Sequence, residues 1–207
     1  MSSRPLIERA RHPAILAAAV EVIRERGLEH TSVADVAERV GTSPSSVLYW
    51  FASKGELLTI ALTAAEESFY QELEADLASL SSPRERMKRL IEAATGTGDY
   101  EAALWIDLWA RALRDEELAG VREQLDVRWR RAIAAIVTEG QAAGEFDAVD
   151  ADELGLLLGS LMDGFAVQIA LGDPAGTPER ARDLCLRVAG RELGCDLCDS
   201  EHSPALR

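Results

Sequence analysis

The stretch between Thr31 and Leu58 constrains the fold more than any other part of these 207 residues. It predicts two short helices joined by a tight glycine turn, then a break and a long helix. Ser32 can cap the first helix, Val33–Val40, because its hydroxyl can accept a hydrogen bond from a free amide of the first turn. The apolar residues of this helix recur at helical spacing and form one packing stripe: Val33, Val36, Ala37 and Val40.

A second short helix, Pro44–Trp50, follows at once. Gly41 stands where the end of a helix often needs a left-handed backbone. Ser43 is a candidate cap, and Pro44 occupies the first helical position, where its missing N–H is not needed. Val47 and Phe51 are expected to be buried, with the hydroxyl and aromatic side chains turned elsewhere.

A third helix, Ala14–Arg26, precedes these two and ends at Gly27. Its apolar residues lie on one face: Ile15, Ala18, Ala19, Val22 and Ile23. Three helices in this order are typical of a helix-turn-helix DNA-binding head, which we expect over residues 1–55. The helix Val33–Val40 would brace the DNA backbone, and Pro44–Trp50 would enter the major groove.

Side chains around the second short helix are of types that contact DNA. Hydroxyls can bond phosphates or base edges, Pro44 can contact a thymine methyl group, and Lys54 places a positive charge at the start of the long helix. The candidate DNA-binding residues are Thr31, Thr42, Ser43, Pro44, Ser45, Ser46, Tyr49, Trp50 and Lys54. The alternative is that they are ordinary surface and packing residues, with Trp50 buried between the head and the long helix.

The charge is unevenly distributed along the chain, whose formal net charge is −14. Residues 1–55 contain seven Lys and Arg against six Asp and Glu, a net charge of +1, so the remainder carries −15. An acidic body repels DNA. A near-neutral head can still bind it through local placement of cations, such as Arg4, Arg9 and Arg11 in the leading arm.

Composition favours an ordered, soluble protein, since 47% of the residues are hydrophobic and 28% are charged, and the two features that follow lead us to expect a cytoplasmic location. No apolar run reaches about 18 residues, the length of a membrane span. Residues 1–13 lack the hydrophobic stretch of a signal peptide. Three cysteines suit reduced thiols rather than a disulfide framework.

From Ser53 onward the pattern is helical with no credible strand, which predicts an all-α fold of nine helices, six of them in a C-terminal body. Caps, prolines and glycines place these six at Ser53–Leu80, 83–94, 99–114, 116–143, 150–171 and 178–193. We expect a ligand-binding and dimerisation domain over residues 56–194 and a disordered tail over residues 195–207.

Aromatic residues and an acid mark a candidate ligand site in the body. Trp105 and Trp109 stand four residues apart and share a helix face, away from Asp107. Asp163 follows an apolar run, where a carboxylate needs a partner or a ligand. Aromatic rings with an acid favour a cationic or amine ligand, although a packed core is the alternative. The candidate ligand-binding residues are Trp105, Trp109, Trp129, Asp163, Phe165 and Gln168.

The two last helices, 150–171 and 178–193, are expected to pair with their copies as a four-helix seam around a twofold axis. The candidate residues for its apolar core are Leu157, Leu161 and Leu184. Gly155 and Gly159 would allow a close helix approach at such a dimer seam, unless they are incidental small residues.

No set of residues points to an enzyme or a cofactor. Cys185, Cys195, Cys198 and His202 are metal-ligand types, but their spacing is loose, and nearby acids raise the pKa of the thiols. The sequence shows no nucleophile with its base, no phosphate loop and no pair of catalytic carboxylates. We therefore expect no metal, no cofactor and no catalytic activity.

The N-terminal residues resemble the TetR family of one-component bacterial transcriptional regulators. The resemblance rests on the helix end Ala17–Gly27, on Thr31 with Val33 and Val36–Ala37, on Gly41–Ser43, and on Tyr49–Phe51 followed by Lys54 and Leu57–Leu58. The body resembles the choline-type repressor branch through Asp163–Gly164 and the closing helix. Two positions depart from the family: Leu48 replaces the first of two aromatic residues, which contacts DNA in relatives, and Ser45 replaces a frequent glycine.

The resemblance implies a homodimeric, ligand-responsive repressor that binds a palindromic operator in double-stranded DNA. Its body would sense a small organic effector whose binding moves the long helix Ser53–Leu80 and respaces the two heads. One alternative is an activator or a ligand-free regulator of the same fold. Another is a helical small-molecule-binding protein or enzyme in which the helix-turn-helix is only scaffold. Salt-dependent binding to the DNA upstream of its own gene would separate these classes.

Overall fold

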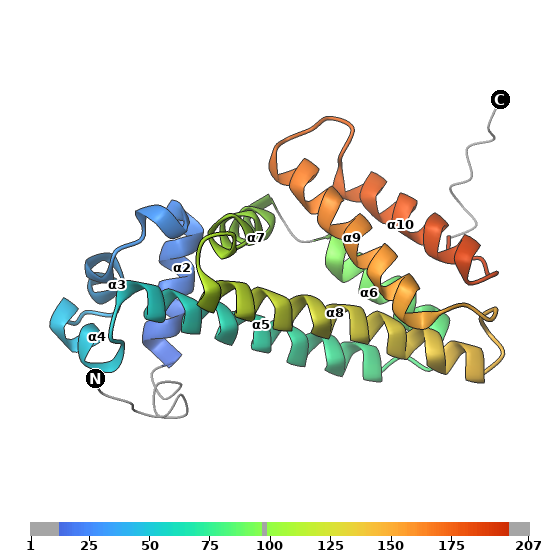
Figure 1. Cartoon of the computed structure of the whole chain (residues 1–207), viewed down its shortest axis with the longest axis horizontal. Helices are drawn as coiled ribbons and strands as arrows, with labels where there is room; N and C mark the ends of the chain where they lie inside the picture. Colours follow the sequence, from blue (N-terminus) through green and yellow to red (C-terminus); the bar gives the residue numbers. More distant parts are fainter. Residues whose placement is uncertain (1–12, 97–98, 199–207) are drawn as a thin grey trace. The chain divides into compact units, whose positions relative to one another are not determined.

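The computed structural model describes residues 13–96 and 99–198, and every regular element in this part is a helix (Figure 1). Its helices are α2 (Pro13–His30), α3 (Val33–Arg39), α4 (Pro44–Trp50), α5 (Lys54–Ala78), α6 (Pro83–Thr95), α7 (Asp99–Ala112), α8 (Glu116–Ala142), α9 (Ala151–Ala170) and α10 (Pro178–Glu192). The predicted all-α fold is confirmed, and α3 to α10 end within two residues of their predicted bounds. The cations expected in the leading arm, Arg4, Arg9 and Arg11, lie outside the described residues.

Helix starts coincide with side-chain caps. Ser32, Ser43 and Asp150 accept hydrogen bonds from first-turn amides of α3, α4 and α9, as the sequence predicts. Ser82 and Thr177 do the same for α6 and α10. A proline in the first turn of α4, α6 and α10 adds a backbone angle that already suits a helix. Local sequence alone therefore fixes where most helices begin.

Two glycines of the head have positive φ angles, one at the kink in α2 and one in the turn after α3. Gly27 has φ 78° and ψ 162°, so the regular part of α2 ends at Arg26 as predicted, although Leu28 and its neighbours continue in helical form to His30. Gly41 has φ 68° in the turn between α3 and α4. A residue with a Cβ would be strained in either conformation, so both turns require glycine.

The chain divides into two compact units, residues 1–72 with 103–122 and residues 73–102 with 123–207. In the first unit, α2, α3, α4 and the beginning of α5 enclose an apolar core that includes the fully buried Val36, Val47 and Phe51. Leu57 and Ala61 of α5 also belong to this core. The head core thus continues beyond residue 55, and the boundary between residues 55 and 56 stays a prediction.

The core of the second unit lies between α6, α8, α9 and α10. Leu90 and Ile91 of α6, Ile133 of α8, Leu158 of α9 and Cys185 of α10 are fully buried in it. Contacts of α10 with both α6 and α9 close this core. The second unit therefore has its own hydrophobic interior, as a separately packed body requires.

Helix α9 approaches α8 closely at Gly155. A Cβ placed at Gly155 would lie 2.8 Å from the carbonyl oxygen of Arg130, and one at Gly159 would lie 3.7 Å from the ring of Trp129. These glycines therefore serve a helix contact within the chain. This finding corrects the prediction of a dimer seam at these glycines, because they lie on the side of α9 that packs against α8. It also shows that Gly155 is not an incidental small residue, since a Cβ there would be too close to Arg130.

The chain does not leave the body directly after α10. Leu197 is only 1% exposed and belongs to the core of the second unit, and a Cβ at Gly190 would meet the carbonyl oxygen of Cys195 at 2.7 Å. The predicted disordered tail is therefore wrong for residues 195–198. Residues 199–207, which include His202, lie outside the described part.

Helix α9 is long and apolar enough, by length and composition alone, to cross a membrane. One side of it packs into the body, where Leu154, Leu158 and Met162 are buried. Leu156 and Leu157 on other sides of the helix are exposed. We therefore interpret α9 as a core helix with an exposed apolar face.

Candidate nucleic-acid interface

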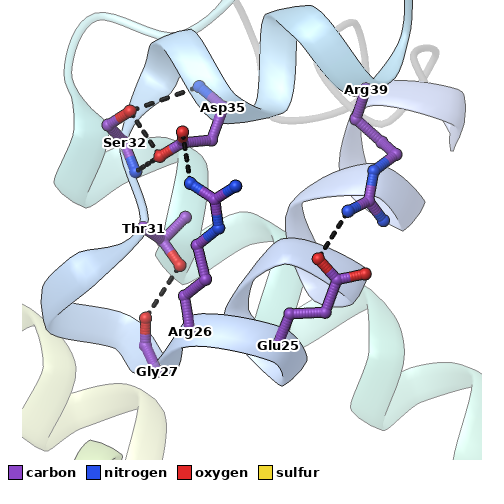
Figure 2. Close-up of polar contacts among 7 residues, drawn as sticks. All are labelled: Glu25, Arg26, Gly27, Thr31, Ser32, Asp35 and Arg39. Carbon is purple, nitrogen blue, oxygen red and sulfur yellow. Dashed lines mark hydrogen bonds and ion pairs between the residues drawn. The ribbon is translucent and has the colours of Figure 1, made fainter.

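Helix α3 begins with a capping box formed by Ser32 and Asp35 (Figure 2). The amide of Asp35 donates to Ser32 Oγ at 3.2 Å, and the amide of Ser32 donates to Asp35 Oδ2 at 2.9 Å. The Ser32 hydroxyl donates to the same carboxylate oxygen at 2.6 Å. These hydrogen bonds, with the nearby Arg26, lower the pKa of Asp35, so the carboxylate that fixes the first turn stays ionised.

Ion pairs fasten α3 to α2. Arg26 Nη1 lies 2.6 Å from Asp35 Oδ1, and Arg39 lies 2.6 Å from Glu25 Oε2 and 3.0 Å from Glu21 Oε2 (Figure 2 shows the first two). The hydrogen bond from Arg39 lowers the pKa of Glu25, and the two glutamates raise the pKa of Arg39. Exposed pairs are individually weak, so their role here is to set the orientation of α3. The four-residue spacing of Glu21 and Glu25 is the sequence signal that could have indicated them.

Thr31 lies inside the head rather than on its surface. Its side chain is buried, with the residue 1% exposed, and its hydroxyl donates to the carbonyl oxygen of Gly27 at 2.8 Å (Figure 2). That hydrogen bond holds the backbone just after the kink in α2. This placement corrects the prediction that Thr31 contacts DNA, because its side chain is buried in the head.

The start of α4 presents a cluster of exposed hydroxyls. The amide of Ser46 donates to Ser43 Oγ at 3.1 Å, which is the capping bond of α4. The same Ser43 oxygen lies 2.9 Å from Ser45 Oγ and 2.8 Å from Ser46 Oγ. Thr42 and Pro44 beside them are exposed as well. The predicted contact residues Thr42 to Ser46 thus form one continuous exposed surface.

The two faces of α4 have different roles. Val47 and Phe51 are fully buried in the head core, as predicted, and they fix the rotation of the helix. Tyr49 is 63% exposed and Leu48 is 45% exposed. Trp50 is half-buried against the head core, and its ring meets that of Tyr49 edge to face at 5.1 Å. Packing against the core therefore explains much of the position of Trp50. Leu48, which was not among the candidate DNA-binding residues, belongs to the exposed surface of α4.

Lys54 connects the start of α5 to the end of α2. Its Nζ donates to the carbonyl oxygen of Glu29 at 2.9 Å, and the side chain is half-buried. Ser53 Oγ caps α5 by accepting from the amide of Glu56 at 3.1 Å, and the Glu56 carboxylate accepts from the amide of Ala52. The positive charge of Lys54 thus lies at the start of α5, and the carboxylate of Glu56 lies in the same turn.

The candidate ligand residues are distributed between the two units. Trp105 and Trp109 on α7 belong to the first unit and are half-buried there. In the second unit, Trp129 and Phe165 pack against the core, whereas Asp163 and Gln168 are exposed. Gln168 lies against the loop after α9, because a Cβ added at Gly176 would come within 2.7 Å of the Cβ of Gln168. The ligand site stays a prediction, and the side chain of Asp107 is outside the described residues.

The candidate seam residues differ in exposure, and Leu161 packs against the core of the second unit. Leu157 of α9 is 46% exposed, and Leu161 and Leu184 are half-buried. Leu156 is exposed beside them on α9. Leu156 and Leu157 are consecutive residues, so two neighbouring leucines of α9 are exposed, and the dimer seam stays a prediction.

Burial determines the protonation of the three cysteine thiols. Burial raises the pKa of Cys185 to about 12, and burial also raises the pKa of Cys195 and Cys198. These shifts keep the three thiols protonated near neutral pH. Within residues 13–96 and 99–198, no group of three or more potential metal ligands comes together.

Two family descriptions match the chain. Residues 15–59 match the bacterial regulatory proteins of the tetR family, and residues 83–194 match the C-terminal domain of BetI-type transcriptional repressors. The first range contains α3, α4 and most of α2, and the second runs from the start of α6 to the end of α10.

Individual proteins are similar over most of their length. HTH-type transcriptional regulator BetI of Rhizobium meliloti (strain 1021) is 25% identical over 168 residues, or 80% of both chains. The fatty acid metabolism regulator protein of Bacillus subtilis (strain 168) is 25% identical over 140 residues, covering 67% of this chain and 72% of that protein. A solved structure described as a transcriptional regulator from Saccharomonospora viridis, in complex with choline, is 28% identical with a TM-score of 0.78, covering 85% of this chain and 93% of its own.

Proposed function

Because the chain belongs to the TetR family of bacterial transcriptional regulators and carries a BetI-type repressor body, we propose that it represses transcription as a homodimer on a palindromic operator and releases the DNA when a small cation binds. Members of this family are regulators rather than enzymes. Repression and release require only that the effector favours a conformation with lower affinity for DNA. A cytoplasmic location would follow from this role.

The head supports DNA binding through the exposed surface of α4 and its neighbouring cation. The observation that best supports DNA binding is the division of this segment into two faces. Val47 and Phe51 are buried in the head core, while Thr42 to Ser46, Leu48 and Tyr49 remain exposed. In this arrangement the hydroxyls contact phosphates or base edges, and Lys54 contacts a phosphate. The helix-turn-helix places such a surface in the major groove.

Pairing of two copies would use the outer side of α9 and α10. The exposed Leu157, with Leu161 and Leu184, provides an apolar face on these two helices. A twofold axis would pack this face against its copy and produce a four-helix seam. Two heads related by the same axis would then match the two half-sites of a palindrome.

The charge of the body and the BetI-type match both favour a cationic effector. Residues 56–207 carry a net charge of −15, which attracts cations at long range and repels anions. Aromatic faces with a carboxylate bind quaternary ammonium groups. A relative at 28% identity is solved with choline, which is a molecule of this kind. We therefore propose that Trp105, Trp109, Trp129, Asp163, Phe165 and Gln168 include the residues that contact a quaternary ammonium effector.

Fluorescence anisotropy with the DNA upstream of its own gene tests this function. The protein is expected to bind that duplex more tightly than a scrambled duplex of the same composition, and choline is expected to weaken the binding. Asp163→Asn should blunt the choline response, whereas Asp152→Asn, an exposed acid on the same helix, should not.

The possible failures of this experiment are distinguishable. Equal binding to the two duplexes would refute the regulatory role. Specific binding that choline leaves unchanged, but that a fatty acyl thioester abolishes, would refute the effector class alone.

A further inference from the structure

The head lacks the side chains with which proteins most often distinguish bases. From Val40 to Ser53 the sequence contains no charged, amide or imidazole side chain. Guanine is commonly recognised by Arg or Lys through two hydrogen bonds, and adenine by Asn or Gln in the same way. Helix α4 cannot form either two-bond contact with a base edge.

The cations that flank this stretch are already engaged within the head. Arg39 pairs with Glu21 and Glu25 of α2, and Lys54 donates to the carbonyl oxygen of Glu29. Arg39 would have to leave two carboxylates to reach a base. Within the stretch from Val40 to Ser53, base recognition therefore falls to hydroxyl and apolar groups.

The serine hydroxyls at the start of α4 are partly engaged with one another. Ser43 Oγ accepts from the amide of Ser46 and lies within hydrogen-bond distance of the hydroxyls of Ser45 and Ser46. Each of these groups can form at most one or two further hydrogen bonds with single atoms. A lone hydroxyl can donate or accept, so it distinguishes bases poorly.

Leu48 is the large aliphatic side chain that α4 exposes. It is 45% exposed, and it follows Pro44 by four residues, so the two share one side of the helix. Its exposure is not required by packing, because Val47 and Phe51 fill the core side of α4. An apolar group on this surface loses water-exposed area only when a partner covers it.

We infer that Leu48, with Pro44 beside it, recognises the methyl groups of thymines in the major groove, so that each half-site is selected mainly by thymine methyls rather than by paired hydrogen bonds to purines. This inference rests on the proposed function as a DNA-binding repressor. Thymine is the one DNA base that carries a methyl group in the major groove, where α4 is expected to lie. Apolar contact with that methyl is a direct means of distinguishing thymine from cytosine.

The experiment starts from duplexes that the full-length protein selects from a random library. In the selected sites, each thymine is replaced in turn by deoxyuracil, which removes only the methyl, and each purine by its 7-deaza form, which removes the N7 acceptor. We expect at least one thymine per half-site where the methyl loss weakens binding about fourfold, equivalent to ~0.8 kcal/mol for one buried methyl group. The methyl lies in the major groove, so contacts in the minor groove are unaffected.

Variants connect the effect to one side chain. Leu48→Ala should lose the penalty for deoxyuracil, whereas Leu48→Met, which keeps an apolar group of similar size, should retain it. Leu113→Ala is the matched control, because Leu113 is an exposed leucine outside the helix-turn-helix, and it should bind both DNAs like the parent protein.

The possible results separate the proposed function from the recognition of thymine methyls. Failure of the parent protein to select any sequence would refute the proposed function itself. Selection of sites that tolerate deoxyuracil, or that suffer more from 7-deaza purines, would overturn the methyl inference and leave the function intact. An unchanged deoxyuracil penalty in Leu48→Ala would assign the methyl contact to another residue and overturn the role of Leu48.

Discussion

Replacing Gly155 by alanine should separate helix α9 from α8. The added Cβ would lie 2.8 Å from the carbonyl oxygen of Arg130, well under the 3.4 Å at which ordinary van der Waals contact begins. The oxygen belongs to the backbone of a helix, so it cannot rotate away as a side chain would. Overpacking of this kind destabilises a protein by about 1–3 kcal/mol, which outweighs the roughly 1 kcal/mol that alanine gains over glycine in a helix.

Gly164→Ala provides the matched control on the same helix. A Cβ at Gly164 meets no atom within 4 Å, so only the gain in helix propensity remains, and stability should rise by about 0.5–1 kcal/mol. The two variants are therefore expected to shift the free energy of unfolding in opposite directions.

Urea unfolding followed by circular dichroism measures both variants at one fixed protein concentration, because dimerisation would make the midpoint depend on concentration. A midpoint for Gly155→Ala at or above that of the parent protein would refute the close contact between α9 and α8. Equal shifts of the urea midpoint in Gly155→Ala and Gly164→Ala would also refute this contact.

Three further outcomes are expected. The pKa of Asp35 is lowered in the folded head, so the ionised carboxylate stabilises the head fully above its ordinary pKa of 3.8, and this stabilisation is lost as the pH falls through the lowered pKa of the folded state. Asp35→Asn should therefore destabilise the protein near neutral pH and match the parent protein in acid. A difference in stability that stays constant with pH would contradict this. Lys54→Ala should weaken binding to all DNA sequences alike and reduce the salt slope by about one, whereas a sequence-dependent loss would count against a phosphate contact. Leu157→Lys should yield monomers in sedimentation experiments while Leu113→Lys does not, and a stable dimer of Leu157→Lys would rule out the proposed seam.

The order and bounds of the helices could be predicted because their determinants are local. Ser32, Ser43 and Pro44 act within one turn of where they stand, and Gly41 needs only its own backbone angle. The exposed face of α4 could be predicted for the same reason, since its period alone separates the buried Val47 from its neighbours.

Features that join distant segments could not be predicted in this way. The pairing of Arg39 with Glu25 depends on how α3 crosses α2, and the role of Gly155 depends on which residue of α8 comes opposite it. Thr31 has the right chemistry for a phosphate contact, but its position behind the kink at Gly27 turns it inward. The ligand set requires several helix faces to be known at once, which a periodic pattern does not provide.

The separation of roles in the head bears on how such a regulator can change its target. The residues that hold α4 in place, Val47 and Phe51, are inward, and the charged residues that orient α3 bond to α2. Ser45 and Leu48 face outward, so substitutions there are expected to alter stability by no more than about 0.5 kcal/mol. After a gene duplication, one copy could therefore acquire a new operator by successive surface changes while its head stays folded at every step.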